Sequence, residues 1–256
     1  MNTTFWIAGK HTVLSAINNP NRTIVEVFTN EENRSLCDNA NKNNSRTFKV
    51  STKKNSDISK VLKNKDIAHQ GLAALVKKIE PPSEDEIFKN NKDKENSTFL
   101  MLDNLTDERN IGSIIRSAAA FYVDAIFLLK KNYNFDSQSM YKSASGAMEY
   151  VPIIPVVNLT NSINLMKQNN FWILGLDGQG SADLIDFEWP KKVTIVLGSE
   201  GFGMRRLVKE NCDQICKINI NSKIESLNVS NAVASCLTLN LKQKKAQENK
   251  FLGLIF

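Results

Sequence analysis

The stretch VTIVLGSEGFGM, at residues 193–204, joins an apolar run to a turn rich in glycine. The run predicts a strand covered on both faces, because a half-exposed strand would alternate apolar and polar residues. Gly198, Gly201 and Gly203 permit positive φ and a close approach to a ligand, although a plain turn would explain them equally well. The turn lacks the Gly-Lys-Ser/Thr of a phosphate-binding loop and the spacing of the dinucleotide fingerprint, so it predicts neither of those sites.

Similar apolar runs recur along the second part of the chain and alternate with helical segments. The predicted strands are 98–103, 125–129, 153–157, 171–177, 193–198 and 214–220. The predicted helices are 109–121, 137–144, 160–168, 204–211 and 228–244. This alternation predicts a parallel sheet wrapped by helices, with ligands bound outside the carboxyl ends of the strands.

The first part of the chain predicts a smaller α/β domain. Its expected strands are 24–29, 46–50 and 71–78, and its expected helices are 11–18, 31–43 and 56–63. A charged, polar stretch with Pro, Asn and Ser follows and has the composition of a linker. We therefore expect a domain at 1–79, a linker at 80–97 and a larger domain at 98–256.

Composition restricts the classes of protein to which the chain can belong. The 256 residues carry a formal charge of +6. A positive charge is common among nucleic-acid-binding proteins, but by itself it does not identify one. No apolar run reaches the roughly 20 residues of a membrane helix, and the N-terminus lacks a signal-peptide pattern, so we expect a cytoplasmic protein without a membrane partner. The few cysteines suit buried thiols in a reducing compartment, and Cys212 and Cys216 lack further zinc ligands, so no metal is expected.

Several polar residues stand at the ends of predicted strands. Arg116 lies among small and apolar residues, so its guanidinium either reaches solvent or points at an RNA phosphate or a reacting group. Glu200 either accepts hydrogen bonds within the glycine-rich turn or caps the following helix. Asn228 precedes the last helix, where it caps that helix or lines a site.

The inventory of reactive side chains excludes several mechanisms. No G-x-S-x-G elbow is present, and His11 and His69, the two histidines, both lie in the first domain, so the larger domain contains no histidine-based triad. The residues suit transfer of an already activated group, or binding alone.

Four segments, taken together and in order, resemble motifs of the SpoU (TrmH) family of RNA 2′-O-ribose methyltransferases. They are NIGSIIRSAAAF (110–121), KSASGA (142–147), VLGSEGFGM (196–204) and ININSKIESLNVSNA (218–232). In the first domain, IAGKHTVL (7–14) and HQGLAA (69–74) resemble the L30e-like RNA-binding domain that precedes the catalytic domain in guanosine 2′-O-methyltransferases of large-subunit rRNA.

The resemblance implies an α/β-knot catalytic domain with a deep trefoil knot, of the SPOUT class, behind a small α/β L30e-like domain. It implies a homodimer that binds S-adenosylmethionine and methylates a guanosine ribose in 23S rRNA or in a ribosome-assembly intermediate. Two alternatives stay open: a tRNA methyltransferase of the same family and a non-catalytic RNA-binding assembly factor.

The resemblance also implies roles for individual residues. Residues expected to contact the cofactor are Gly178, Leu197, Gly198, Gly201, Ile218, Ile220, Leu227 and Asn228. Residues expected at the catalytic centre are Asn110, Arg116, Glu200, Ser226 and Asn228. Residues expected to contact RNA are Lys10, His11, Arg22, His69 and Gln70, with ordinary solvated surface as the alternative for each.

The chain departs from the usual family pattern at four positions. Glu108 and Asn219 stand where the family has proline, and Tyr122 and Ser222 stand where it has glycine. The substitutions at Asn219 and Ser222 remove a backbone restraint and easy access to positive φ from the expected cofactor loop.

Overall fold

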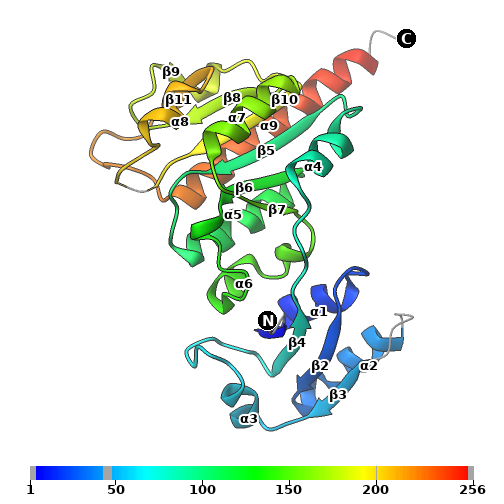
Figure 1. The fold of residues 1–256 in the computed structure, drawn as a ribbon. Coiled ribbons are helices and arrows are strands. Elements are labelled where there is room, and N and C mark those ends of the chain that lie inside the picture. The colour runs from blue at the N-terminus through cyan, green and yellow to red at the C-terminus, as the bar shows by residue number, and fades with distance from the viewer. Residues whose placement is uncertain (1–3, 43–47, 200, 253–256) are drawn as a thin grey trace. The chain divides into compact units, whose positions relative to one another are not determined.

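The computed structural model describes residues 4–42, 48–199 and 201–252, which belong to two compact units (Figure 1). Unit 1 comprises residues 1–80, 107–116 and 134–150, and unit 2 comprises residues 81–106, 117–133 and 151–256. Residues 107–116 and 134–150 thus belong to the same unit as the N-terminal region. The domain boundaries expected from the sequence place these two segments in the larger domain.

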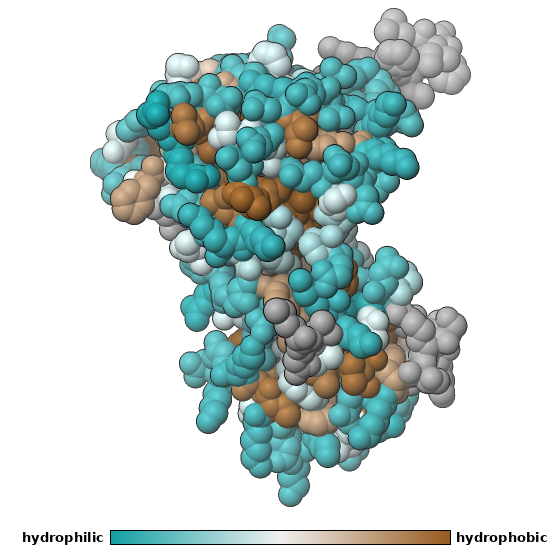
Figure 2. Space-filling model, viewed as in Figure 1, coloured by the Kyte–Doolittle hydropathy of each residue, from teal (hydrophilic) through white to brown (hydrophobic). Residues whose placement is uncertain are grey.

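None of the helices that the structure describes is long and apolar enough to cross a membrane. Hydrophilic residues cover most of the face shown in Figure 2, and hydrophobic residues gather there in small areas. All four cysteines are free thiols, and Cys37, Cys216 and Cys236 are buried. Burial raises the pKa of the Cys212 thiol to about 12, so this thiol stays protonated at neutral pH.

Unit 1 is built on a four-stranded sheet in the order β1-β4-β2-β3. Its strands are β1 (Thr4–Ala8), β2 (Ile24–Thr29), β3 (Lys49–Thr52) and β4 (Leu72–Lys77). β4 pairs antiparallel with β1 and β2, and β3 runs parallel to β2. The sequence predicts β2, β3 and β4 but misses β1, because its five residues are too few to show a clear period.

The helices of unit 1 come from separate parts of the chain. The N-terminal region supplies α1 (Lys10–Asn18), η1 (Glu31–Asn33), α2 (Arg34–Lys42) and α3 (Asn55–Lys60). The internal segments supply α6 (Gln138–Ala144), η3 (Ala147–Glu149) and the larger part of α5 (Glu108–Ala120). α6 packs on β1, where the rings of Phe5 and Tyr141 lie 5.4 Å apart between centroids.

Unit 2 contains a seven-stranded sheet in the order β7-β6-β5-β10-β8-β11-β9, in which all neighbouring strands run parallel. Its strands are β5 (Ser97–Leu102), β6 (Ala125–Leu129), β7 (Ile153–Val156), β8 (Trp172–Leu176), β9 (Ala182–Asp183), β10 (Lys192–Leu197) and β11 (Gln214–Lys217). Every residue of β5 and β6 is buried, as their continuous apolar sequences predict.

Helices cover both faces of this sheet. They are α4 (Glu84–Asn91), α7 (Leu159–Gln168), α8 (Arg206–Glu210) and α9 (Val229–Leu252), with η2 (Lys130–Asn132) and η4 (Leu184–Asp186). Figure 1 shows α7 on one face and α9 on the other. α9 is tied to β5 by Asn240, whose Nδ2 donates to Thr98 Oγ1 over 2.9 Å.

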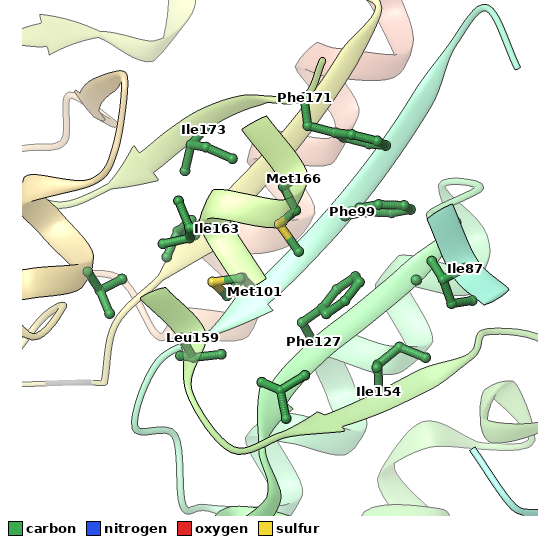
Figure 3. Packing of buried hydrophobic residues seen from close by; sticks show 14 of the residues in the cluster. Ile87, Phe99, Met101, Phe127, Ile154, Leu159, Ile163, Met166, Phe171 and Ile173 are labelled. Atoms are coloured by element: carbon green, nitrogen blue, oxygen red, sulfur yellow. The ribbon is translucent and has the colours of Figure 1, made fainter. Parts of the chain in front are cut away.

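The core between α7 and the sheet is aromatic (Figure 3). The Phe99 and Phe171 rings stack with centroids 4.2 Å apart, and the Phe127 ring lies 5.3 Å from Phe99. Ile163 and Met166 of α7 are fully buried against them. Burial of each such side chain contributes roughly 1.5–3 kcal/mol, so this core fixes the sheet whose strand ends carry the polar turns.

The stretch expected to be a linker at 80–97 is largely structured. Ser83 and Glu86 form a capping box that begins α4. Ile87 and Phe88 then bury their side chains in the aromatic core. The linker prediction is wrong over α4, because two adjacent apolar residues suffice to dock a short polar helix.

Candidate active site

A cavity of about 450 Å³ opens in unit 2 at the carboxyl ends of β8 and β10. Its volume lies within the roughly 300–1,000 Å³ typical of small-molecule sites. Its lining residues are Leu176, Asp177, Gly178, Gln179, Leu197, Gly198, Ser199, Gly201, Gly203, Ile218, Ile220, Glu225, Ser226, Leu227, Val229 and Ala232. The sequence marks the turns after β8, β10 and β11 separately as candidate ligand-binding turns, and in the structure all three line one cavity.

The turn after β10 requires glycine. Ser199 and Gly203 exchange backbone hydrogen bonds of 3.1 and 2.9 Å. A Cβ on Gly198 would lie 2.0 Å from the carbonyl carbon of Gly203, and Gly203 has a φ of 66°. Ser199 Oγ is buried and has no hydrogen-bond partner in the described part of the chain. The tight turn thus places an unsatisfied hydroxyl in the wall of the cavity.

The turn after β8 presses against β11. A Cβ on Gly180 would lie 2.5 Å from the carbonyl carbon of Cys216, and the Asp177 amide donates to the Cys216 carbonyl over 3.0 Å. At Gly178, by contrast, a Cβ would have no neighbour within 4 Å. Gly178 therefore leaves its part of the cavity open.

Asp177 places a negative charge in the cavity wall. Its carboxylate accepts hydrogen bonds from Lys209 Nζ over 2.8 Å and from the Gln179 amide over 2.9 Å. Burial acts to raise the pKa of this carboxyl, but the two hydrogen bonds outweigh burial and lower the pKa. Asp177 is consequently ionised at neutral pH and can accept hydrogen bonds from a ligand.

The third turn ends where α9 begins. Asn228 Oδ1 accepts hydrogen bonds from the Ser230 amide over 3.0 Å and from Ser230 Oγ over 2.6 Å. The Ala232 amide donates to the Asn228 carbonyl over 3.0 Å. Asn228 therefore caps α9, as one of the two expected roles requires.

The two departures in this turn have local structural explanations. The Asn219 amide donates to the Asp183 carboxylate of β9, so a side-chain hydrogen bond restrains the loop where proline is usual. Across the described ranges, positive φ outside glycine occurs only at Gln70, Asn104, Tyr122, Ser145 and Asn170. Ser222 thus has an ordinary backbone conformation, and its position does not require glycine.

Most residues predicted to contact the cofactor line this cavity. The lining includes all of them except Asn228. It also includes Asp177, Ser199 and Glu225, which sequence reasoning missed. Asp177 and Ser199 directly follow the ends of β8 and β10, so position at a strand end would have found them, whereas the signal for Glu225 is its place beside the predicted Ser226.

The residues predicted for catalysis are distributed differently. Ser226 lines the cavity, and Glu200 lies outside the described residues. Asn110 and Arg116 lie on α5, within the segment assigned to unit 1. In the part of the chain that the structure describes, no group of three or more His, Cys, Asp or Glu residues is placed to hold a metal ion.

α5 presents Arg116 to solvent. Ile114, Ile115 and Ala118 bury the opposite side of the helix. Arg116 is exposed, and no hydrogen bond or ion pair engages its guanidinium among the described residues. The guanidinium is therefore available to a ligand.

The prediction that Arg22 contacts RNA is wrong. Arg22 is only 1% exposed, and its guanidinium donates to Glu149 Oε1 over 2.8 Å. It also donates to the Lys77 carbonyl and to Tyr141 Oη, each over 3.0 Å. Burial acts to lower the pKa of Arg22, but Tyr141 and Glu149 outweigh it and raise the pKa. These partners occupy the guanidinium, so Arg22 is a structural residue.

The other residues predicted to contact RNA lie around one turn and the start of α1. Lys10 begins α1 and His11 is exposed. Gln70 is exposed with a φ of 53°. His69 Nδ1 accepts from the Gly71 amide over 3.0 Å, so the ring is neutral and its Nε2–H donates to Ser59 Oγ. Burial, and then the charge of Lys142, lower the pKa of His69, so His69 holds the turn rather than supplying a cation.

Two family matches divide the chain much as its motifs do. Residues 97–238 match the SpoU rRNA methylase family. The chain belongs to that family. Residues 6–82 match the substrate-binding domain of RNA 2′-O-ribose methyltransferases, so the SpoU domain is preceded by a domain that binds substrate.

A relative supports the membership, and two solved structures share the fold. A Staphylococcus aureus (strain MSSA476) protein assigned to the TrmH family of tRNA/rRNA methyltransferases is 41% identical over 167 residues, which is 65% of this chain and 67% of that protein. The SpoU methyltransferase AviRb from Streptomyces viridochromogenes, in complex with AdoMet, superposes with a TM-score of 0.78 at 18% identity over 94% of this chain and 91% of that one. An AdoMet-bound rRNA methyltransferase from Sinorhizobium meliloti gives a TM-score of 0.77 at 18% identity over 94% and 88%.

These matches confirm the predicted fold class, a SPOUT α/β-knot catalytic domain with an N-terminal α/β substrate-binding domain. The SpoU protein is an RNA 2′-O-ribose methyltransferase.

Proposed function

We propose that this SpoU protein transfers a methyl group from S-adenosylmethionine to the 2′-hydroxyl of a guanosine ribose in 23S rRNA. The observation that carries the proposal is the meeting of three strand-end turns around one cavity. The AdoMet complexes of AviRb and of the Sinorhizobium meliloti enzyme support the choice of cofactor.

The chemistry of the cavity suits that cofactor. The open side at Gly178 leaves room for a ligand ring, and Gly198 also lines the cavity. Ser199 Oγ is an unsatisfied buried hydroxyl, for which a polar ligand atom would supply a partner. The ionised Asp177, which pairs with Lys209, can still accept hydrogen bonds from the hydroxyl or amino groups of that cofactor.

The reaction needs an activated methyl group, a correctly placed ribose hydroxyl and stabilisation of the charge that forms on its oxygen. When bound, S-adenosylmethionine supplies a methyl group on a positively charged sulfur, which is already activated for transfer. The protein must align the ribose oxygen with that methyl and stabilise the oxygen as its proton leaves. A guanidinium is not deprotonated in proteins, so we assign Arg116 to positioning the hydroxyl and stabilising its negative charge. Asn110 orients Arg116 or the ribose.

Three further residues complete the proposed centre. Ser226 and Asn228 shape the wall beside the cofactor, and Asn228 does so by fixing the start of α9. We assign Glu200, which lies outside the described residues, to holding the motif loops or the basic group in place.

The substrate-binding domain supports rRNA over tRNA as the target. Such a domain matches residues 6–82, whereas tRNA members of the family often lack it. The Sinorhizobium meliloti rRNA methyltransferase also matches nearly the full chain. The name of the Staphylococcus aureus relative covers both RNA classes, so tRNA is retained as the alternative substrate. We place the target in the peptidyl-transferase region of 23S rRNA.

The protein is proposed to act as a homodimer. Phe202 is 91% exposed and Ile224 is 56% exposed, and both lie on turns that surround the cavity. Ile220 and Leu227 on the same turn are also exposed. Apolar side chains gathered in this way favour contact with another protein surface, and we propose that a second copy covers them.

One experiment tests the activity and its target together. The protein is incubated with labelled S-adenosylmethionine and either deproteinised 23S rRNA or a tRNA pool, and 2′-O-methyl positions are mapped. Label in 23S rRNA supports the proposal, and label in tRNA alone would replace the substrate. Absence of label from both pools, together with absence of cofactor binding by calorimetry, would indicate a non-catalytic RNA-binding assembly factor.

A further inference from the structure

Lys142 of α6 is a half-buried lysine without an acidic partner. Its Nζ donates to Gln70 Oε1 over 3.1 Å, and no carboxylate of the described residues forms an ion pair with it. Burial lowers the pKa of Lys142, as is expected for an ammonium group without an acidic partner. A charge held in this way favours an anion from outside the chain.

The side chain of Gln70 lies beside Lys142 and carries an NH₂ group that can donate hydrogen bonds. Its Oε1 accepts from both Lys142 Nζ and the Lys10 amide, the latter over 3.2 Å. These two donors fix the orientation of the side-chain amide, so its NH₂ group points away from them. No partner for that NH₂ group exists among the described residues. Lys142 and Gln70 thus present only N–H donors to solvent.

The backbone around these two residues is adapted to bring them together. Gly9 has a φ of 105°, and a Cβ there would lie 3.0 Å from Lys142 Nζ and 3.5 Å from Gln70 Oε1. Glycine therefore lets the lysine approach the start of α1. On the other side, His69 accepts the Gly71 amide and holds Gln70 at its positive φ of 53°.

Close packing holds α6 in place on α1. A Cβ on Gly146 would lie 2.3 Å from Ser15 Oγ, so the Ser15 side chain packs directly against the backbone of Gly146. Thr12 Oγ1 donates to the Tyr141 carbonyl over 3.3 Å, and the buried pair of Arg22 and Glu149 closes the same contact. Lys142 therefore has a defined position relative to Gln70 within unit 1.

We propose that Lys142 and Gln70 form a binding site for a phosphate of the RNA backbone. This site depends on the proposed RNA methyltransferase function, and it combines residues from the substrate-binding region and the SpoU region. Gln70 lies in the substrate-binding region 6–82, whereas Lys142 lies in the SpoU region 97–238. Charge-assisted N–H donors without acceptors suit a phosphate, which offers acceptors alone.

The same helix contacts the helix that carries Asn110 and Arg116. Gly112 of α5 packs on α6, where a Cβ would lie 2.4 Å from the Met140 carbonyl oxygen. A phosphate bound by Lys142 would therefore be held by α6, which packs directly against α5. This packing gives the site a positioning role in addition to its contribution to affinity.

Gln70→Glu is the sharpest test, because it keeps the shape and both accepted hydrogen bonds but replaces the NH₂ donor by a negative oxygen. That oxygen would pair with Lys142 and repel phosphate, so affinity for deproteinised 23S rRNA in filter binding should fall at least about tenfold. Melting temperature and cofactor affinity should not fall. An unchanged RNA affinity in this variant would overturn the proposal.

Lys142→Gln tests the charge itself. The slope of log K against log salt should decrease by about 0.7–0.9, the value for one phosphate contact. Lys49→Gln is the matched control, since Lys49 is an exposed lysine of unit 1 that already pairs with Glu26, and its slope should match that of the wild type. Weaker binding with an unchanged slope would contradict a phosphate contact. A wild-type protein that methylates no RNA would refute the proposed function, whereas methylation combined with normal RNA binding in both variants would refute this site alone.

Discussion

Arg205 donates two hydrogen bonds of 2.7 Å to the fully buried carboxylate of Asp103, one from its backbone amide to Oδ2 and one from its side-chain Nε to Oδ1. Asp103 follows β5, and Arg205 follows the glycine turn that lines the cavity. The pair therefore ties the turn after β10 to the neighbouring strand of the sheet.

Asp103→Asn should loosen that turn. The amide cannot accept at both positions, which should cost about 1–3 kcal/mol in the free energy of unfolding and weaken cofactor binding. Urea denaturation and calorimetry measure the two effects. Arg206→Gln, which removes the exposed neighbouring pair with Glu210, should change the free energy of unfolding by less than about 1 kcal/mol. Equal effects of the two changes would contradict a special role for Asp103.

Arg116→Ala should abolish methyl transfer while leaving cofactor affinity unchanged, because the guanidinium acts on the ribose and not on the cofactor. Arg116→Lys should recover little activity, since an ammonium lacks the planar fork of donors. Arg109→Ala is the control, as it removes an exposed arginine from the same helix. Methyl transfer to 23S rRNA measures all three, and an active alanine variant would refute the assigned role.

Tyr122→Gly should stabilise the protein. Tyr122 has a φ of 57°, a conformation that costs an L-residue about 1–2 kcal/mol, and its side chain is 75% exposed. Glycine removes that strain but adds roughly 0.5–1 kcal/mol of backbone entropy cost, so a net gain of about 0.5–1 kcal/mol is expected. Tyr150→Gly, at an exposed tyrosine with a φ of −114°, should give no gain in a thermal melt. A lower melting temperature for the Tyr122 variant would contradict this account.

Asp177 should make stability depend on pH in acid. Its folded pKa is depressed, so its contribution is present above the unfolded value of about 3.9 and is lost as pH falls through the folded pKa. The difference in unfolding free energy between wild type and Asp177→Asn should thus be constant near neutrality and narrow below about pH 4. Urea titrations at a series of pH values measure it, and a difference that widened in acid would have the wrong sign.

Arg22→Ala should destabilise unit 1 by about 3–5 kcal/mol, because it leaves the Glu149 carboxylate buried without its partner. The double change Arg22→Met with Glu149→Leu should recover much of that loss, since it removes both charges together. Thermal melts compare the variants. If Arg22 bound RNA instead, the double variant would be stable but would fail to bind 23S rRNA.

The buried strands were predictable because each is a short apolar run with polar ends, and such runs follow from local sequence. The meeting of the strand-end turns was predictable for the same reason, given a parallel sheet. The burial of Arg22 was not, because its acceptor Glu149 lies 127 residues away and nothing local marks the pair. α4 was missed because its composition is polar and only Ile87 and Phe88 dock.

The role of Asp177 illustrates the same limit. Its position after a strand was visible in the sequence, but its ionisation depends on Lys209, which lies on α8. Local sequence thus indicates where polar groups gather, whereas their charge state depends on partners that only the folded chain brings close.

The contact at Gly146 and Ser15 has a consequence for how such enzymes can be recombined. A chimera that exchanged only the region before residue 80 would replace both Ser15, which faces Gly146, and Arg22, which pairs with the buried Glu149. An exchange of the N-terminal region between relatives should therefore include the 134–150 segment, because the two pack as one unit.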